Sequence, residues 1–275
     1  MGRPKKLRQP KAGTPEKGKV HRATRGRRLW VTSVILVAGV FLAAAVAGGL
    51  LLHGSFSSDS SAGPKTAAIV DQLSLTQPNP SFAEAATATL EQTGYAVDYY
   101  PGEEVTVDFY KNLPTHGYDL IIMRTHSGLA RDYGEPTNYV SLFSNEPFSD
   151  TKYAAEKAAG LVGRSSYHEG GAQYFGIVPA FIESSMTGRF DGAIIVLMGC
   201  DGLITDTTAE AFIRKGAKTV VGWSGRVSAT HTDAATEHLL RHLLIDRLTT
   251  TDAVAQTTTE VGPDPEYDST LLSYP

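Results

Sequence analysis

The two residues best suited to covalent chemistry are a histidine and a cysteine that each follow an apolar segment. His126 ends the run DLIIMRTH, and Cys200 ends the run AIIVLMGC. An imidazole beside a thiol can take its proton or stabilise the thiolate, and either effect activates the sulfur as a nucleophile. Glycines beside both residues leave room for a substrate backbone, and the amides of Gly128 and Cys200 are candidates to hold an oxyanion.

These side chains can meet only if the two apolar segments are neighbouring parallel strands. The hydrophobic pattern predicts strands at 66–71, 95–100, 118–124, 192–198 and 217–223, and helices at 82–92, 105–113, 207–214 and 233–247. Strands that alternate with helices form a mostly parallel α/β sheet flanked by helices, whose reactive edge lies at the carboxyl ends of its strands. Residues 129–190, rich in Gly, Ser and Tyr, are expected to form a less regular insertion with a helix at 152–161.

The two motifs, in this order and on strands, resemble a known clan of cysteine peptidases. It contains caspases, gingipains, clostripain, legumain and separase, shares the caspase-haemoglobinase fold and includes the CHAT domains. The resemblance covers residues 66–247, including the segment Val-Gly-Trp-Ser that ends the fifth strand. It implies a catalytic dyad of His126 and Cys200, a peptide substrate bound in a groove beside Trp223 and Ser224, and no required cofactor, although calcium assists some relatives.

The chain departs from the pattern of these peptidases in two ways. Several relatives that cleave after basic residues carry an Asp two positions before the Cys, where this chain has Met198. The interval between His126 and Cys200 is also longer than in many relatives. The residue preferred before the cleaved bond is therefore left open.

The sequence predicts a cysteine-type endopeptidase, and two other interpretations remain. The same fold without activity can hold a ligand or protein partner at the sheet edge, and a flavodoxin-like binding domain would keep Cys200 as a small core residue. Asp71 and Asp201 also lie at predicted strand ends, where either can orient His126, bind a basic substrate residue or stay in solvent. A thiol of depressed pKa would alkylate quickly near neutral pH, and a structural one would not.

A membrane anchor is predicted ahead of this domain. Residues 29–52 contain no charged side chain, and these 24 residues exceed the roughly 20 that a helix needs to cross a bilayer. Residues 1–28 hold 11 Lys or Arg and one acid, which predicts a cytoplasmic tail. The expected order is a basic tail (1–28), an anchor (29–52), a flexible tether (53–65) and an extracytoplasmic domain (66–275). A cleaved signal peptide is the alternative.

Charge and cysteine content limit the partners of the outer domain. Residues 29–275 contain 14 basic and 28 acidic side chains, which argues against nucleic-acid binding. The basic tail instead suits anionic lipid headgroups. Small residues at 43–49 have the spacing that allows membrane helices to pair, so a homo-oligomer is possible. Cys200 is the single cysteine, and no intrachain disulfide can form.

Three histidines on the last long predicted helix form a separate pattern. His231, His238 and His242 share one face of that helix, and such a stripe can bind a metal. The segment HLLRH lacks the Glu of a zincin motif, and no carboxylate nearby in the sequence is clearly placed to complete the set. The sequence therefore predicts no metal site.

Overall fold

The apolar strands β1 (Lys65–Asp71) and β3 (Leu120–Arg124) lie side by side near the centre of a six-stranded sheet. This computed structural model describes residues 63–132 and 135–275. The sheet has the order β10-β9-β8-β3-β1-β2, with the remaining strands at Tyr95–Pro101 (β2), Ile194–Leu197 (β8), Thr219–Trp223 (β9) and Leu271–Tyr274 (β10). All pairs are parallel except β9 with β10. The prediction of a mostly parallel α/β sheet is confirmed.

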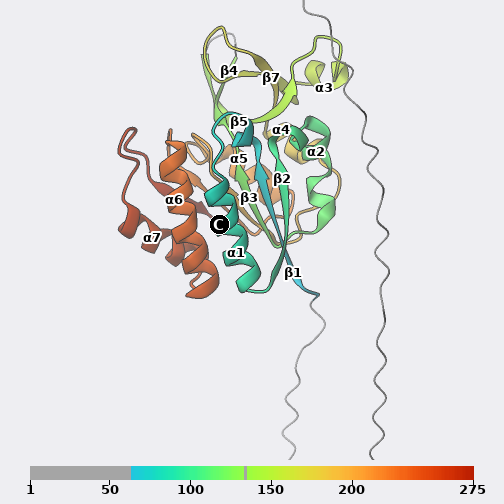
Figure 1. Cartoon of the computed structure of the whole chain (residues 1–275). Coiled ribbons are helices and arrows are strands. Elements are labelled where there is room, and N and C mark those ends of the chain that lie inside the picture. Colours follow the sequence, from blue (N-terminus) through green and yellow to red (C-terminus); the bar gives the residue numbers. More distant parts are fainter. Residues whose placement is uncertain (1–62, 133–134) are drawn as a thin grey trace, which may run out of the picture. The chain divides into compact units, whose positions relative to one another are not determined.

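Helices cover both faces of this sheet (Figure 1). One face carries α1 (Pro80–Gln92), α6 (Ala229–Leu240) and α7 (Thr250–Val261), and the other carries α2 (Val107–Asn112), α4 (Pro179–Ser184) and α5 (Thr207–Arg214). Alternate residues of each strand enter opposite cores: in β1, Ala67 and Ile69 face the first layer, and Ala68 and Val70 face the second. Burial on both faces explains why the strands are continuously apolar.

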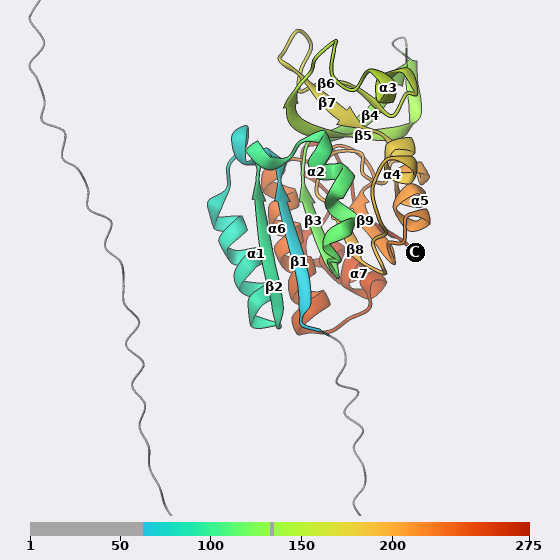
Figure 2. The ribbon, with the colours of Figure 1, turned by 90° about the vertical axis from the view of Figure 1, so that its right-hand side faces the viewer.

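A second, smaller sheet lies beyond the carboxyl ends of the parallel strands (Figure 2). It is antiparallel with the order β4-β5-β7-β6, formed by Ser127–Asp132 (β4), Glu135–Pro147 (β5), Val162–Ser166 (β6) and Gln173–Ile177 (β7). The expectation of an irregular insertion at 129–190 is therefore wrong. The helix expected at 152–161 is a short one, α3 (Ala154–Ala158).

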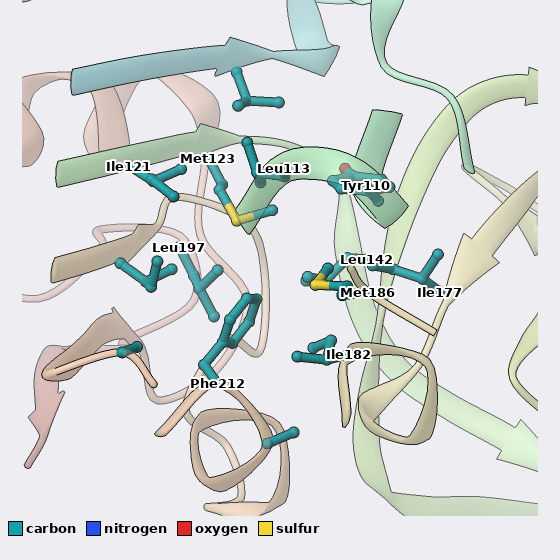
Figure 3. Close-up of a cluster of buried hydrophobic side chains, with 14 of the residues drawn as sticks. Tyr110, Leu113, Ile121, Met123, Leu142, Ile177, Ile182, Met186, Leu197 and Phe212 are labelled. Atoms are coloured by element: carbon teal, nitrogen blue, oxygen red, sulfur yellow. The ribbon is translucent and has the colours of Figure 1, made fainter. Parts of the chain in front are cut away.

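The small sheet shares a hydrophobic core with the main sheet, and this shared core explains why residues 127–177 form regular strands. Leu142 of β5 and Ile177 of β7 pack with Ile182 and Met186, and the same cluster continues to Met123 of β3 (Figure 3). All five side chains are at most 3% exposed. Removing these residues from water ties β5 and β7 to the end of the parallel sheet.

Short turns complete the fold. Three 3₁₀ turns lie at Gln72–Leu75, Gly102–Glu104 and Leu113–His116, and a π-helical turn at Arg241–Ile245 extends α6. Within the described residues, no helix is both long and apolar enough to cross a membrane. The predicted tail (1–28), anchor (29–52) and most of the tether (53–62) lie outside the described residues.

Candidate active site

Strand register places His126 and Cys200 at matching positions beyond two neighbouring strands. Met123 of β3 lies opposite Leu197 of β8, and three further residues along each chain lead to His126 and Cys200. The two segments stay in contact after the strands end. Ser127 Oγ donates a 2.7 Å hydrogen bond to the carbonyl of Cys200, and Gly199 packs so tightly against Thr125 O and Ser127 Oγ that a Cβ would clash.

Both side chains line one cavity of about 1080 Å³ at this edge of the sheet. Its walls come from the segments that follow β1, β3, β8 and β9, from the small sheet and from the loop before β10. Gly128, Asp201 and Tyr167 also line it. A volume of this size accommodates a peptide segment. No hydrogen bond joins His126 to Cys200 among the residues described.

Groups from distant parts of the chain position the backbone and the ring of His126. Its Nε2 lies 3.2 Å from Thr76 Oγ1, and its ring packs on Tyr167 with 4.3 Å between centroids. The backbone amide donates to Gln72 Oε1 at 2.8 Å, and the carbonyl accepts from Phe143 N at 3.0 Å. The backbone and the ring are therefore both fixed.

A polar network behind His126 supports this arrangement. Gln72 Nε2 donates to Asn145 Oδ1 at 2.6 Å and to the Tyr167 hydroxyl at 2.9 Å, and that hydroxyl donates to Asn145 Oδ1 at 2.8 Å. Gln72 is fully buried, so these bonds also satisfy its amide. Sequence reasoning missed this network because residues 72, 145 and 167 share no local spacing.

Cys200 lies against the loop after β9. Its Sγ lies 3.5 Å from both the amide and the carbonyl of Val227. Asp264 accepts hydrogen bonds from the amide (2.9 Å) and the hydroxyl (2.8 Å) of Ser228, which fixes that loop. No residue among those described accepts a hydrogen bond from the Cys200 amide, which suits the proposed oxyanion contact.

The surroundings favour neutral forms of both groups. Burial, with a smaller effect of the Arg124 charge, lowers the pKa of His126 to about 4. Burial is also the main cause that raises the pKa of the Cys200 thiol, against an opposing effect of the Val227 amide. Near neutral pH the site therefore holds a thiol and a neutral imidazole. Slow alkylation of the unliganded protein is expected, so that measurement alone does not separate a catalytic thiol from a structural one.

The low pKa of His126 predicts a pH-dependent loss of stability. Between about pH 6.5 and 4 the unfolded chain binds a proton that the folded chain does not, so stability falls as pH falls through this window. Urea unfolding should show that wild type loses more stability from pH 6.5 to 4.5 than His126→Asn, by roughly fortyfold in the folding equilibrium. The exposed His168→Asn variant is the control and should follow wild type. Parallel curves for His126→Asn and wild type would contradict the assignment.

The two candidate aspartates have structural contacts. Asp201, in the left-handed region at φ 61°, accepts a 3.1 Å hydrogen bond from the amide of Leu129 and so joins the segment after β8 to β4. Asp201 still lines the cavity. Asp71 does not reach His126: it is 1% exposed and bonds Arg124 at 2.8 Å and the Tyr99 hydroxyl at 3.0 Å. The interpretation of Asp71 as a residue in solvent or a substrate ligand is wrong.

The two residues expected beside the substrate groove do not line this cavity. Trp223 is 1% exposed, and its Nε1 donates to Thr232 Oγ1 at 2.9 Å within the core. Ser224 pairs with the segment before β10, because its hydroxyl accepts from Thr270 N at 3.0 Å. The loop that follows them does reach the cavity, through Arg226 and Val227.

Comparisons with known proteins give distant similarities only. No family model matches the sequence, and no curated protein matches it. Among solved structures, the Arg-specific cysteine proteinase gingipain R aligns with a TM-score of 0.39 and 13% identity over 71% of this chain. This chain spans 42% of that structure. A protein from Geobacter sulfurreducens aligns with a TM-score of 0.35 and 12% identity, over 76% of this chain and 93% of that one. At these scores neither similarity supports an argument about function.

Proposed function

We propose that the chain is a cysteine-type endopeptidase in which Cys200 is the nucleophile and His126 the general base. The observation that carries the proposal is the shared position of the two residues. They follow neighbouring parallel strands at matching register and line one cavity at the carboxyl edge of the sheet. This edge is where the reactive groups of α/β sheets lie.

Because the resting site holds a neutral thiol and a neutral imidazole, the thiol must lose its proton as the sulfur attacks the substrate. As Cys200 Sγ bonds to the scissile carbonyl carbon, its proton passes to His126, and the carbonyl oxygen becomes an oxyanion. The amide of Cys200 is the candidate donor to that oxyanion, because Gly128 is paired with Ser141 in the β4–β5 ladder and its amide points toward β5. The C–N bond then breaks, and the leaving amine takes the proton from the imidazolium. Water, deprotonated by His126, hydrolyses the thioester and restores the thiol.

Thr76 is proposed to orient the base. Because Thr76 Oγ1 lies 3.2 Å from Nε2, the tautomer with a proton on Nε2 donates to this hydroxyl and leaves Nδ1 as the acceptor. Nδ1 is then the atom that takes the thiol proton. Thr76, together with the tilted Tyr167 ring packed 4.3 Å away, would serve as the group that orients the histidine of a nucleophile–histidine pair.

A binding module without turnover is the competing function. In it, the same cavity would hold a peptide or another ligand without bond cleavage. Incubation of the purified chain with a peptide library, followed by mass spectrometry of products, separates the two. Cleavage at defined sites, with covalent labelling of Cys200 by a peptide electrophile, is the expected result. Saturable peptide binding with neither cleavage nor labelling would replace the peptidase by the binding module.

We also propose that the domain lies outside the cytoplasmic membrane on a single-pass anchor at 29–52, because basic residues crowd its N-terminal side. Protease added to intact cells should therefore digest residues 66–275 and leave the tail at 1–28 protected. Blots with antibodies against each end check this, with a cytoplasmic protein as the control for intact cells. Complete protection of the domain while a known outer protein is digested would refute this orientation.

A further inference from the structure

A cluster of metal-binding side chains lies away from the proposed active site, where α6 and α7 pack together. It consists of His238 at the end of α6, His242 in the π-helical turn and Glu260 near the end of α7. One ligand atom from each residue lies within 4.8 Å of the others. The helix stripe seen in the sequence is thus joined by a carboxylate from the next helix.

The three ligand atoms already converge on one point. Glu260 Oε2 lies 2.7 Å from His238 Nδ1 and 3.1 Å from His242 Nε2. In a tetrahedral zinc site with bonds near 2.0–2.1 Å, neighbouring ligands are about 3.4 Å apart. Both distances to Glu260 are within roughly 1 Å of that spacing, and all three ligand atoms lie within 4.8 Å of one another.

Hydrogen bonds behind the ligands have the pattern of a built metal site. The second ring nitrogen of His242, Nδ1, lies 2.7 Å from Asp246 Oδ2, which leaves Nε2 to face the cluster. Gln256 Nε2 donates to Glu260 Oε1 at 3.0 Å and leaves Oε2 to face it. A carboxylate behind a ligating histidine fixes the ring and raises its basicity as a ligand. His242 is 3% exposed, so its position is set by packing as well.

We propose that His238, His242 and Glu260 form a binding site for a divalent transition metal of the zinc class, with water as fourth ligand. Two imidazoles and one carboxylate suit zinc and exclude a preference for magnesium or calcium, which take oxygen ligands. The metal would join α6 to α7. This site is independent of the proposed peptidase function.

Arg241 also contacts the cluster. Its Nη2 lies 2.6 Å from Glu260 Oε2 and 3.2 Å from His242 Nε2. The side chain is 47% exposed and can move into solvent. Arginine and metal therefore compete for Glu260, and removal of the arginine should favour the metal.

Zinc titration into the full chain, without an affinity tag, in mild detergent and after chelator treatment, tests the proposal. We expect one equivalent to bind by calorimetry and a Tm rise of about 5 °C at a hundredfold excess over Kd. His238→Gln and Glu260→Gln should weaken binding at least tenfold, and Asp246→Asn about tenfold. Arg241→Gln should tighten it. The matched control is His231→Gln, on the same helix but bonded to Gly262 O, and it should bind zinc as wild type does.

Two results would overturn the proposal. The first is no zinc binding by wild type and by Arg241→Gln, which would make Arg241 the permanent cation of the cluster. The second is zinc binding that His238→Gln leaves unchanged. His238 is 42% exposed, so its substitution is expected to leave the fold intact, and loss of binding in that variant cannot be assigned to unfolding.

Discussion

Cys200→Ala is expected to abolish peptide hydrolysis, with a loss of at least about 10⁴-fold in kcat, because it removes the atom that bonds to the substrate. The substitution deletes only a sulfur, whose polar contacts are two 3.5 Å interactions with Val227 and which otherwise packs at the margin of an apolar cluster. The circular dichroism spectrum and Tm should therefore remain close to wild type. The variant should still bind a peptide that the wild type cleaves, since the cavity walls are unchanged.

His126→Ala provides the second part of this test. Removing a general base costs roughly 10²–10⁴-fold in rate, so kcat should fall by that factor. The exposed His168→Ala is the matched control and should keep full activity. Residual hydrolysis at the wild-type rate by Cys200→Ala, measured on purified protein free of other peptidases, would end the peptidase hypothesis. Loss of stability with unchanged activity is the outcome that a purely structural Cys200 predicts.

Much of the main sheet could be predicted from the sequence, because strands that are buried on both faces appear as continuous apolar runs. The strands ending at Asp71, Arg124 and Leu197 are continuous apolar runs, and their ends fix where His126 and Cys200 emerge. Right-handed crossovers and short connections limit the possible orders of the strands but do not select one. The apolar runs are local signals, so a single sequence is sufficient to predict them.

The small sheet was not predicted because some of its alternate, inward-facing positions hold polar residues. The apolar–polar alternation typical of a strand is therefore absent from the sequence. Positions 140, 142, 144 and 146 of β5 are all buried, which is the period of a strand, but the last two are Ser144 and Glu146. Ser144 donates to Phe175 O at 2.8 Å, and Glu146 accepts from Tyr153 and Lys152 at 2.9 and 2.8 Å. Such residues are buried only because hydrogen-bond partners satisfy them, and these include the distant Phe175 for Ser144 and the amide of Val107 for Glu146. No local pattern contains that information, and the same holds for Glu260 beside His242.

Arg124→Met is expected to cost about 3–5 kcal/mol in the free energy of unfolding, the largest stability loss predicted for this chain. Arg124 is 1% exposed and bonds Asp233 through Nε (2.7 Å) and Nη2 (2.9 Å), Asp71 through Nη1 (2.8 Å) and the carbonyl of Gln77 (2.9 Å). Asp71 and Asp233 are also buried, so removing the guanidinium leaves two carboxylates without their cation.

An exposed arginine provides the comparison for the stability loss expected of Arg124→Met. Arg214 forms two comparable ion pairs, with Glu183 at 2.7 Å and Glu210 at 3.0 Å, but its side chain is half exposed. Arg214→Met is therefore the matched control and should cost less than about 1 kcal/mol, because water screens and replaces these bonds. Urea and thermal unfolding of both variants measure the difference, which should appear as a Tm drop of roughly 10 °C for Arg124→Met.

A triple variant, Arg124→Met/Asp71→Asn/Asp233→Asn, removes all three charges. Comparing it with Arg124→Met separates the destabilisation caused by unpaired buried carboxylates from the stabilisation that the ion pairs contribute. It should regain part of the stability lost in Arg124→Met, because no buried carboxylate then lacks a cation. Equal stability of Arg124→Met and Arg214→Met would show that the buried network contributes no more than a surface pair. Arg124 ends β3 two residues before His126, so a folded Arg124→Met protein should also lose peptidase activity, because the side-chain bonds that join the end of β3 to Asp71 and to α6 are lost.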